Sequence, residues 1–198
     1  SQIVYTESIF MKITSVKFVK GVVGDDKILA DGIPQVAFIG RSNVGKSSLI
    51  NCITNSKISR TSSYPGSTQE INTFLINDSF YLVDLPGYGF ARASGAGREK
   101  IGDLIDSYLF NSIYTQEKVV LIIDANVGMT DRDMAMLKEL KHFHKDFVII
   151  ANKIDKMTQS EYHHKMTEIK KVVGDSLVIP FSSKKRAGLD NLISEIFK

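Results

Sequence analysis

The sequence contains few of the residues that cross-link or interrupt a chain. Its 198 residues include one cysteine and four prolines. Because Cys52 is the single cysteine, no disulfide can form within the chain, which fits a reducing compartment. Cys52 lies in the apolar run 49–53, so we expect it to be a buried structural residue. The composition, 43% hydrophobic and 24% charged, is close to the globular average and excludes a largely disordered chain.

Long apolar runs are also missing. None approaches the roughly 18 residues needed to cross a membrane. No signal-peptide pattern follows Ser1, and the last residues, 196–198, include no prenylation cysteine. We therefore expect no membrane partner and a cytoplasmic bacterial protein, or an organelle-matrix protein if a targeting segment has been removed. The net charge of +3 is compatible with a polyanionic partner, but an ordinary solvated surface explains it equally well.

Buried strands and helices alternate along the chain. Apolar runs typical of parallel strands covered on both faces lie at 36–39, 119–123, 147–151 and 177–179. Further strands are predicted at 15–19, on a sheet edge, and at 72–76 and 80–83, on either side of a turn at 77–79. Helices are predicted at 47–53, 101–109, 134–141 and 189–197.

This order predicts an α/β fold of three layers, with a mostly parallel sheet of about six or seven strands and helices on both faces. We expect one domain over residues 1–198. Residues 1–34 are expected to form an N-terminal strand and loop extension of that domain, with a loop at 21–34.

A phosphate-binding motif follows the strand predicted at 36–39. Residues 40–47 match GxxxxGK[ST] in full, between a predicted strand and a predicted helix. Such a loop aims backbone N–H groups at phosphate oxygens, and the helix presents its positive end to the same anion. Lys46 is expected to contact the β- and γ-phosphates, and the Ser47 hydroxyl to bind Mg²⁺. A chance match in a chain of this length has a probability of roughly 1%, so a plain glycine-rich turn is a minor alternative. The expected nucleotide contacts here are Gly40, Arg41, Ser42, Asn43, Val44, Gly45, Lys46, Ser47 and Ser48.

A second phosphate element is the DxxG motif Asp84-Leu85-Pro86-Gly87. Asp84 ends a predicted strand, where ligands bind in open α/β sheets, and is expected to hold Mg²⁺ through a water. The Gly87 N–H could contact the γ-phosphate. The alternative is that Asp84 caps a turn.

Between these motifs, Thr68 could complete the magnesium shell beside the nucleotide contacts Pro65, Gly66 and Ser67. Thr61 and Thr73 are rivals, and a simple Pro-Gly turn is the alternative. The residues expected to act in catalysis are Lys46, Thr68 and Gly87, and the metal ligands Ser47, Thr68 and Asp84.

Two motifs near the end of the chain predict recognition of guanine. Residues 152–155 form NKxD after a buried strand. The Asp155 carboxylate can accept hydrogen bonds from guanine N1–H and its amino group, whereas adenine would leave it unpaired. Asn152 would brace the loop, and the Lys153 stem would lie along the ring. Backbone N–H groups at Phe181, Ser182, Ser183 and Lys184 could bind guanine O6. The set predicts GTP and GDP as ligands and nearly excludes an ATP-using kinase.

These motifs resemble those of the translation-factor-like P-loop GTPases and, more narrowly, of the EngB family of ribosome-biogenesis GTPases. The resemblance is carried by residues 36–51, 60–63, 65–69 and 83–91 and extends from about residue 15 to the end. It implies the P-loop GTPase fold and a slow GTPase that binds the large ribosomal subunit, its rRNA and proteins, late in assembly. The chain departs from the family at 152–155, where Thr-Lys-Ala-Asp is usual, and at Ile101, where tryptophan is common.

The residue after the DxxG motif is Tyr88, where Ras-like enzymes carry a water-orienting glutamine. We therefore expect a slow intrinsic rate. In related GTPases an asparagine at the position of Asn43 accompanies a potassium ion; a simple turn cap is an equal alternative. Arg92 and Arg98 are candidates for an arginine finger, although surface charges are the safer interpretation.

Other polar residues are expected to lie on solvated surface. They are His142, His144, His163 and His164, and the basic residues 170–171 and 184–186, which could also contact rRNA. We expect a monomer. A switch in signalling or in cell division and septation, with a protein partner, is the alternative function.

Overall fold

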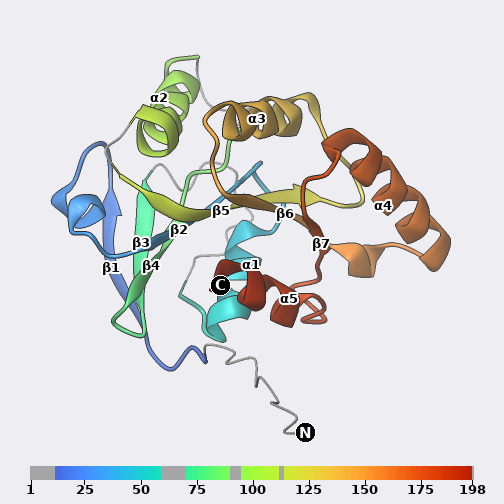
Figure 1. Ribbon diagram of the computed structural model, residues 1–198, viewed down its shortest axis with the longest axis horizontal. Helices are drawn as coiled ribbons and strands as arrows, with labels where there is room; N and C mark the ends of the chain where they lie inside the picture. Colours follow the sequence, from blue (N-terminus) through green and yellow to red (C-terminus); the bar gives the residue numbers. More distant parts are fainter. Residues whose placement is uncertain (1–11, 59–69, 90–94, 112–113, 198) are drawn as a thin grey trace, which may run out of the picture.

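The computed structural model describes residues 12–58, 70–89, 95–111 and 114–197. Its centre is one seven-stranded sheet in the order β1-β3-β4-β2-β5-β6-β7, shown in Figure 1. The strands are β1 (Val16–Val22), β2 (Gln35–Gly40), β3 (Ile71–Ile76), β4 (Phe80–Asp84), β5 (Gln116–Asp124), β6 (Phe147–Asn152) and β7 (Val178–Pro180). Strands β4, β2, β5, β6 and β7 run parallel, and β3 pairs antiparallel with both β4 and β1. The predicted mostly parallel sheet is confirmed.

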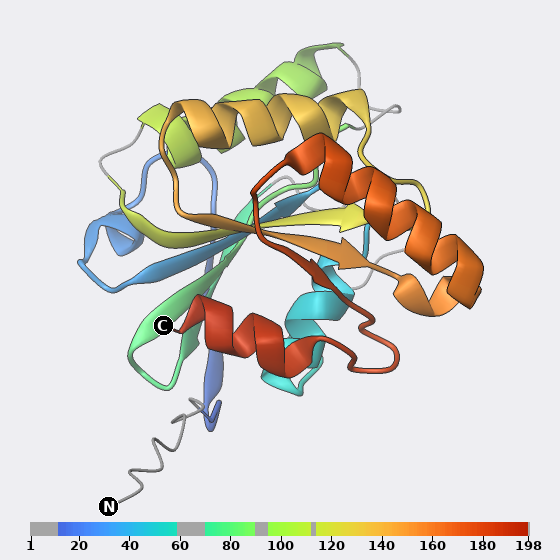
Figure 2. The ribbon, with the colours of Figure 1, turned by 45° about the vertical axis from the view of Figure 1, so that its right-hand side comes forward.

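Helices cover both faces of this sheet. They are α1 (Lys46–Thr54), α2 (Gly95–Asp106), α3 (Asp131–His142), α4 (Gln159–Val173) and α5 (Leu189–Ile196). Helices α1 and α5 lie on one face and α2, α3 and α4 on the other (Figure 2). Each face has its own apolar core, with Leu49 and Leu192 in one and Leu137 and Ile169 in the other. The three predicted layers therefore arise from two apolar cores that share one sheet.

The structure corrects the boundaries of several predicted elements. Strand β1 continues to Val22, into the segment predicted as a loop, and Lys27–Ala30 forms a short 3₁₀ turn, η1. Leu29 in this turn is buried, and its carbonyl accepts a hydrogen bond from Gln35 Nε2 at 2.6 Å. Both contacts attach the turn to the rest of the fold. Helix α4 had no predicted counterpart, because its buried stripe consists only of Met166, Ile169 and Val173. These errors all lie away from the predicted nucleotide loops.

A π-helical turn, η2 (Ser107–Asn111), extends α2 beyond its predicted end. The fully buried Tyr108 in this turn donates a hydrogen bond to Gln35 Oε1 at 2.8 Å. This contact ties the end of α2 to the start of β2.

The parallel strands bring their carboxyl ends to one edge of the sheet. The P-loop follows β2, Asp84 ends β4, Asp124 ends β5, and Asn152 ends β6. In open α/β sheets this edge is where ligands bind. Among the described residues, no helix combines the length and apolar character needed to cross a membrane.

Candidate nucleotide-binding site

The P-loop joins β2 to α1 and depends on two glycines. A side chain at Gly40 would place its Cβ 2.4 Å from the Ile122 carbonyl oxygen of β5. Gly45 has φ +96°, and its Cβ would lie 2.4 Å from Asn152 Nδ2. Glycine is therefore required by close strand packing at the first position, and by left-handed backbone and the NKxD loop at the second.

The lysine of the P-loop and the aspartate of the DxxG motif meet at the phosphate end of the site. Lys46 begins α1 and Asp84 ends β4; both are buried, and the Lys46 ammonium pairs with Asp84 Oδ1. Ser47 follows on the first turn of α1 and is half-buried. Opposite charges thus meet where the sequence predicts phosphate and metal contacts, and the residue after Lys46 carries a hydroxyl.

Gly87 and Tyr88 pack directly on the P-loop. The Tyr88 N–H donates to the Gly40 carbonyl at 3.2 Å, and the Ser42 N–H donates to the Tyr88 carbonyl at 3.2 Å. A Cβ on Gly87 would lie 3.0 Å from Ser42 Oγ. That hydroxyl is buried and has no hydrogen-bond partner among the described residues. A buried donor beside Gly87 fits a phosphate oxygen, which would supply the missing acceptor.

The NKxD loop is tied to the P-loop from the other side. Asn152 Nδ2 donates to the Val44 carbonyl at 2.9 Å. Lys153, in left-handed backbone with φ 70°, donates to the Asn43 carbonyl and forms an ion pair with Asp124 at 2.7 Å between Nζ and Oδ2. These contacts fix the relative position of the phosphate and base ends.

Asp155 is held by the loop that follows β7. Its Oδ1 accepts a 2.6 Å hydrogen bond from the hydroxyl of Ser182. That hydrogen bond is the main cause that lowers the pKa of Asp155 below its usual value, and the nearby ammonium groups of Lys184 and Lys185 lower it further. The carboxylate is therefore kept ionised, as acceptance of two guanine N–H groups requires.

The backbone N–H groups predicted to bind guanine O6 are corrected at two positions. The N–H of the fully buried Phe181 donates to the Ala151 carbonyl at 2.9 Å, and the Ser182 N–H donates to the Ala187 carbonyl at 3.1 Å. Both are used within the fold, and of the four predicted residues Ser183 and Lys184 line the pocket.

One pocket of about 790 Å³ joins these loops. Asp155 lines it together with residues of the P-loop, of helix α1 and of the two base-reading loops. The lining is Gly45, Ser48, Asn51, Cys52, Asn55, Ser56, Lys57, Asn152, Lys153, Asp155, Lys156, Ser183 and Lys184. A volume in this range is typical of small-molecule and cofactor sites.

Cys52 is buried, as expected, and is one of the residues that line this pocket. Burial raises the pKa of the Cys52 thiol. It is therefore kept in the neutral thiol form.

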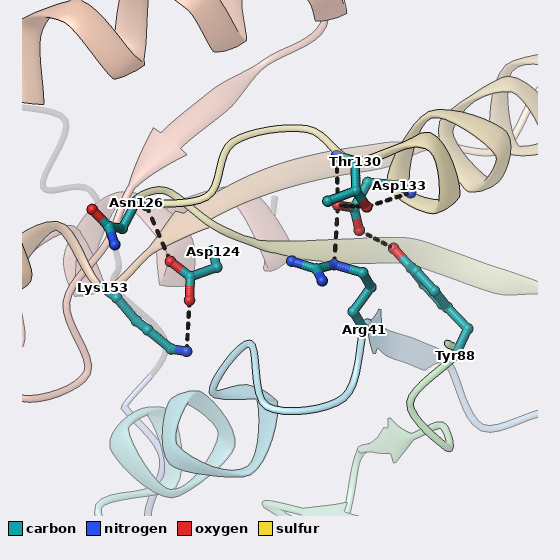
Figure 3. A network of polar contacts seen from close by, with 7 residues as sticks. All are labelled: Arg41, Tyr88, Asp124, Asn126, Thr130, Asp133 and Lys153. Atoms are coloured by element: carbon teal, nitrogen blue, oxygen red, sulfur yellow. Dashed lines mark hydrogen bonds and ion pairs between the residues drawn. The ribbon is translucent and has the colours of Figure 1, made fainter. Parts of the chain in front are cut away.

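A carboxylate that the sequence did not single out connects this site to α3. Asp133 is fully buried and contacts both Arg41 of the P-loop and Tyr88, as Figure 3 shows. Arg41 Nε lies 3.3 Å from Asp133 Oδ2, and the Tyr88 hydroxyl donates to Oδ1 at 2.8 Å. Burial, and then the Asp133 charge, raise the pKa of Tyr88 far above its usual value. The tyrosine therefore remains a hydrogen-bond donor.

The same carboxylate caps α3. Asp133 Oδ2 accepts from the Thr130 N–H at 3.0 Å and from the Thr130 hydroxyl at 2.6 Å. The only sequence signal was the pattern Thr-x-x-Asp before a helix, which predicts a capping box and nothing beyond it.

Several predicted residues lie elsewhere or outside the described ranges. Pro65, Gly66, Ser67 and Thr68 lie outside the described residues, as do Thr61 and Arg92. Thr73 is not at the site: it is buried in β3, and its hydroxyl donates to the Lys20 carbonyl of β1 at 2.9 Å. His163 and His164 lie exposed on α4, where they contact Gln159 and Glu168.

The comparisons with known proteins agree with this geometry. A family model described as a 50S ribosome-binding GTPase matches residues 35–153, and the elongation factor Tu GTP-binding domain model matches residues 109–198. A probable GTP-binding protein EngB of Clostridium beijerinckii is 41% identical over 191 residues, covering 94% of this chain and 96% of the relative. Its counterpart in Geobacillus thermodenitrificans is 42% identical over 183 residues, covering 90% and 93%.

Solved structures show the same likeness. The crystal structure of a probable GTP-binding protein EngB has a TM-score of 0.69 and 25% identity, and covers 82% of this chain and 96% of that one. A single-substitution variant of Aquifex aeolicus Era bound to GDP·AlF₄⁻ has a TM-score of 0.67 and 26% identity, and the match covers 82% of this chain and 55% of that chain.

The sheet, the P-loop and the two loops that carry the guanine-recognition motifs define a P-loop GTPase that binds GTP and GDP. With curated relatives near 40% identity over almost its whole length, the chain belongs to the EngB family of GTP-binding proteins.

Proposed function

We propose that this GTPase is a slow switch in the assembly of the large ribosomal subunit, acting as a monomer in the bacterial cytoplasm. The observation that carries the proposal is the match of residues 35–153 to a family model described as a 50S ribosome-binding GTPase. Era, with a TM-score of 0.66 and 26% identity to this chain, has been solved with MgGDPNP and nucleotides 1506–1542 of 16S ribosomal RNA. This chain covers 55% of that Era chain, so the complex supports a nucleotide partner for the shared fold, and the RNA partner rests on the family model and on the experiment below.

The phosphate end fits a magnesium ion. Asp84 supplies a carboxylate beside the Lys46 ammonium, and Ser47, the next residue of α1, supplies a hydroxyl. Mg²⁺ prefers oxygen ligands that it shares with nucleotide phosphates. Mg²⁺ would neutralise phosphate charge there. Lys46 adds a fixed positive charge, Gly87 offers its N–H to the terminal phosphate, and Asp155 selects guanine.

A slow rate follows from the placement of Tyr88. Its hydroxyl donates to Asp133 of α3, and its backbone is hydrogen-bonded to the P-loop. The side chain is thereby engaged and does not replace the glutamine that orients the attacking water in Ras. Water must be oriented by another group, which the ribosomal partner could supply.

The proposed partner can be tested by co-sedimentation. The protein is mixed with purified large subunits, or with small subunits as a control, in a non-hydrolysable GTP analogue or in GDP. We expect retention on large subunits that is stronger with the analogue and falls as salt rises, because phosphate contacts release counterions. The variant Lys170→Ala/Lys171→Ala, on the exposed end of α4, tests whether this helix contributes. Absence of retention in both nucleotide states, with nucleotide binding intact, would reject the ribosomal role and favour a protein partner in division or signalling.

We also propose a potassium ion near Asn43. This residue is exposed on the P-loop in left-handed backbone, with φ 67°. GTP turnover should be faster in K⁺ than in Na⁺ at equal ionic strength. Equal rates would remove the proposal and leave Asn43 as a turn residue.

A further inference from the structure

Tyr88 is attached to the rest of the site at three points. Its N–H and carbonyl pair with Gly40 and Ser42 of the P-loop, each at 3.2 Å, and its hydroxyl donates to Asp133 at 2.8 Å. The preceding residue, Gly87, lies so close to Ser42 that a Cβ would approach Ser42 Oγ to 3.0 Å. The position of Gly87 relative to the P-loop is therefore set by how firmly Tyr88 is held.

Asp133 is the common partner of both sides of this contact. One carboxylate oxygen pairs with Arg41 of the P-loop and the other accepts from Tyr88 (Figure 3). Because Asp133 is fully buried, no water replaces a lost partner at low cost, and hydrogen bonds to a buried charge are stronger than those between neutral groups. Displacement of Tyr88 would deprive a buried carboxylate of one of its donors.

We propose that Asp133 is a positioning residue of the GTPase reaction. Through the Tyr88 hydroxyl and the Arg41 guanidinium it holds Gly87 against Ser42. At this position the protein distinguishes GTP, which has a γ-phosphate, from GDP, which lacks one. Asp133 acts by fixing a backbone N–H in advance, which removes the cost of ordering that segment when GTP binds. The inference rests on the GTPase activity of the family and not on the ribosomal partner.

A purely architectural role is the competing explanation, because Asp133 also caps α3. The two roles differ in what they change. Loss of a cap lowers stability and affects both nucleotides equally, whereas loss of positioning weakens the GTP analogue and slows hydrolysis without changing GDP affinity.

The test uses Tyr88→Phe in the full chain, which removes one hydroxyl and keeps the ring. Its matched control is Tyr81→Phe: Tyr81, buried in β4, donates to Asp31 Oδ2 at 2.7 Å and lies away from the P-loop. For Tyr88→Phe we expect an affinity for a non-hydrolysable GTP analogue, and a single-turnover hydrolysis rate, about tenfold lower, the factor expected for a lost hydrogen bond to a charged group. GDP affinity should remain within about twofold. For Tyr81→Phe all three should be unchanged.

Asp133→Asn provides a second, isosteric variant that changes the charge and keeps the shape. It should shift the ratio of GTP-analogue to GDP affinity in the same direction. The double variant Tyr88→Phe/Asp133→Asn should lose less than the sum of the two single losses, because both changes act on the contact between Tyr88 and Asp133. An unchanged affinity ratio in both single variants, with only a lower melting temperature, would overturn the proposal, and so would fully additive losses in the double variant.

Discussion

Helices α3 and α4 begin with the same device but in opposite environments. At α3, Thr130 and Asp133 form a capping box; at α4, Thr158 and Glu161 form another. The threonine hydroxyl donates to the carboxylate at 2.6 Å in the first and at 2.8 Å in the second. Asp133 is fully buried and also binds Arg41 and Tyr88, whereas Glu161 is exposed. The same type of capping box thus stabilises only its own helix at α4. At α3 it also connects the helix to the phosphate end of the site.

The largest difference should appear when the carboxylates are removed. Asp133→Ala removes the acceptor of Tyr88 and Thr130 and leaves the Arg41 guanidinium, whose side chain is 25% exposed, without its partner. We expect a loss below the roughly 3–5 kcal/mol typical of breaking a fully buried pair. Glu161→Ala removes only an exposed cap, so its loss should be much smaller. Chemical denaturation of the two variants, analysed for the free energy of unfolding, measures the gap. Equal losses would show that burial of Asp133 adds nothing to its role as a cap.

An intermediate effect is expected at the two threonines. Thr130→Val and Thr158→Val each remove a capping hydroxyl, a change that typically costs about 0.5–2 kcal/mol. The loss at Thr130 should lie at the upper end of this range, because Asp133 is buried and loses one of its donors. Thermal melting of both variants tests the order. A larger loss at Thr158 would contradict the proposed difference between the two boxes.

The smallest effect should be a pH dependence at α4. Hydrogen bonds from the Thr158 backbone and hydroxyl lower the pKa of Glu161 below its usual 4.5. A lowered folded-state pKa gives a stabilisation that is present above 4.5 and is lost as the pH falls through the folded value. The difference in stability between the natural chain and Glu161→Gln should therefore narrow as the pH is lowered below 4.5. Denaturation curves at several acidic pH values measure it, and a difference that widens toward low pH would contradict the sign.

The loops of the site could be located from the sequence because each follows a buried apolar run. Parallel strands deliver such loops to one edge, so Lys46, Asp84 and Asp155 were expected near one another before any coordinates were known.

The role of Asp133 could not be predicted in the same way. Its pattern with Thr130 is local, but its hydrogen bond to Tyr88 joins residues 45 positions apart. The pairing of Lys153 with Asp124 spans 29 positions. Such contacts depend on how α3 and the ends of β5 and β6 pack in three dimensions, which spacing in the sequence does not specify. The same limit explains why Thr73 was a rival for the metal, although its hydroxyl belongs to the pairing of β3 with β1.

The contact between Tyr88 and Asp133 has a consequence for how the family can diversify. This hydrogen bond joins Tyr88 and Asp133, which are the two ends of a segment that contains α2, η2 and β5. Closing a longer flexible loop costs only about 0.6 kcal/mol for each doubling of its length. The connection between η2 and β5 can therefore gain or lose residues over evolutionary time, and acquire new surface, while the two ends of the segment keep the same separation.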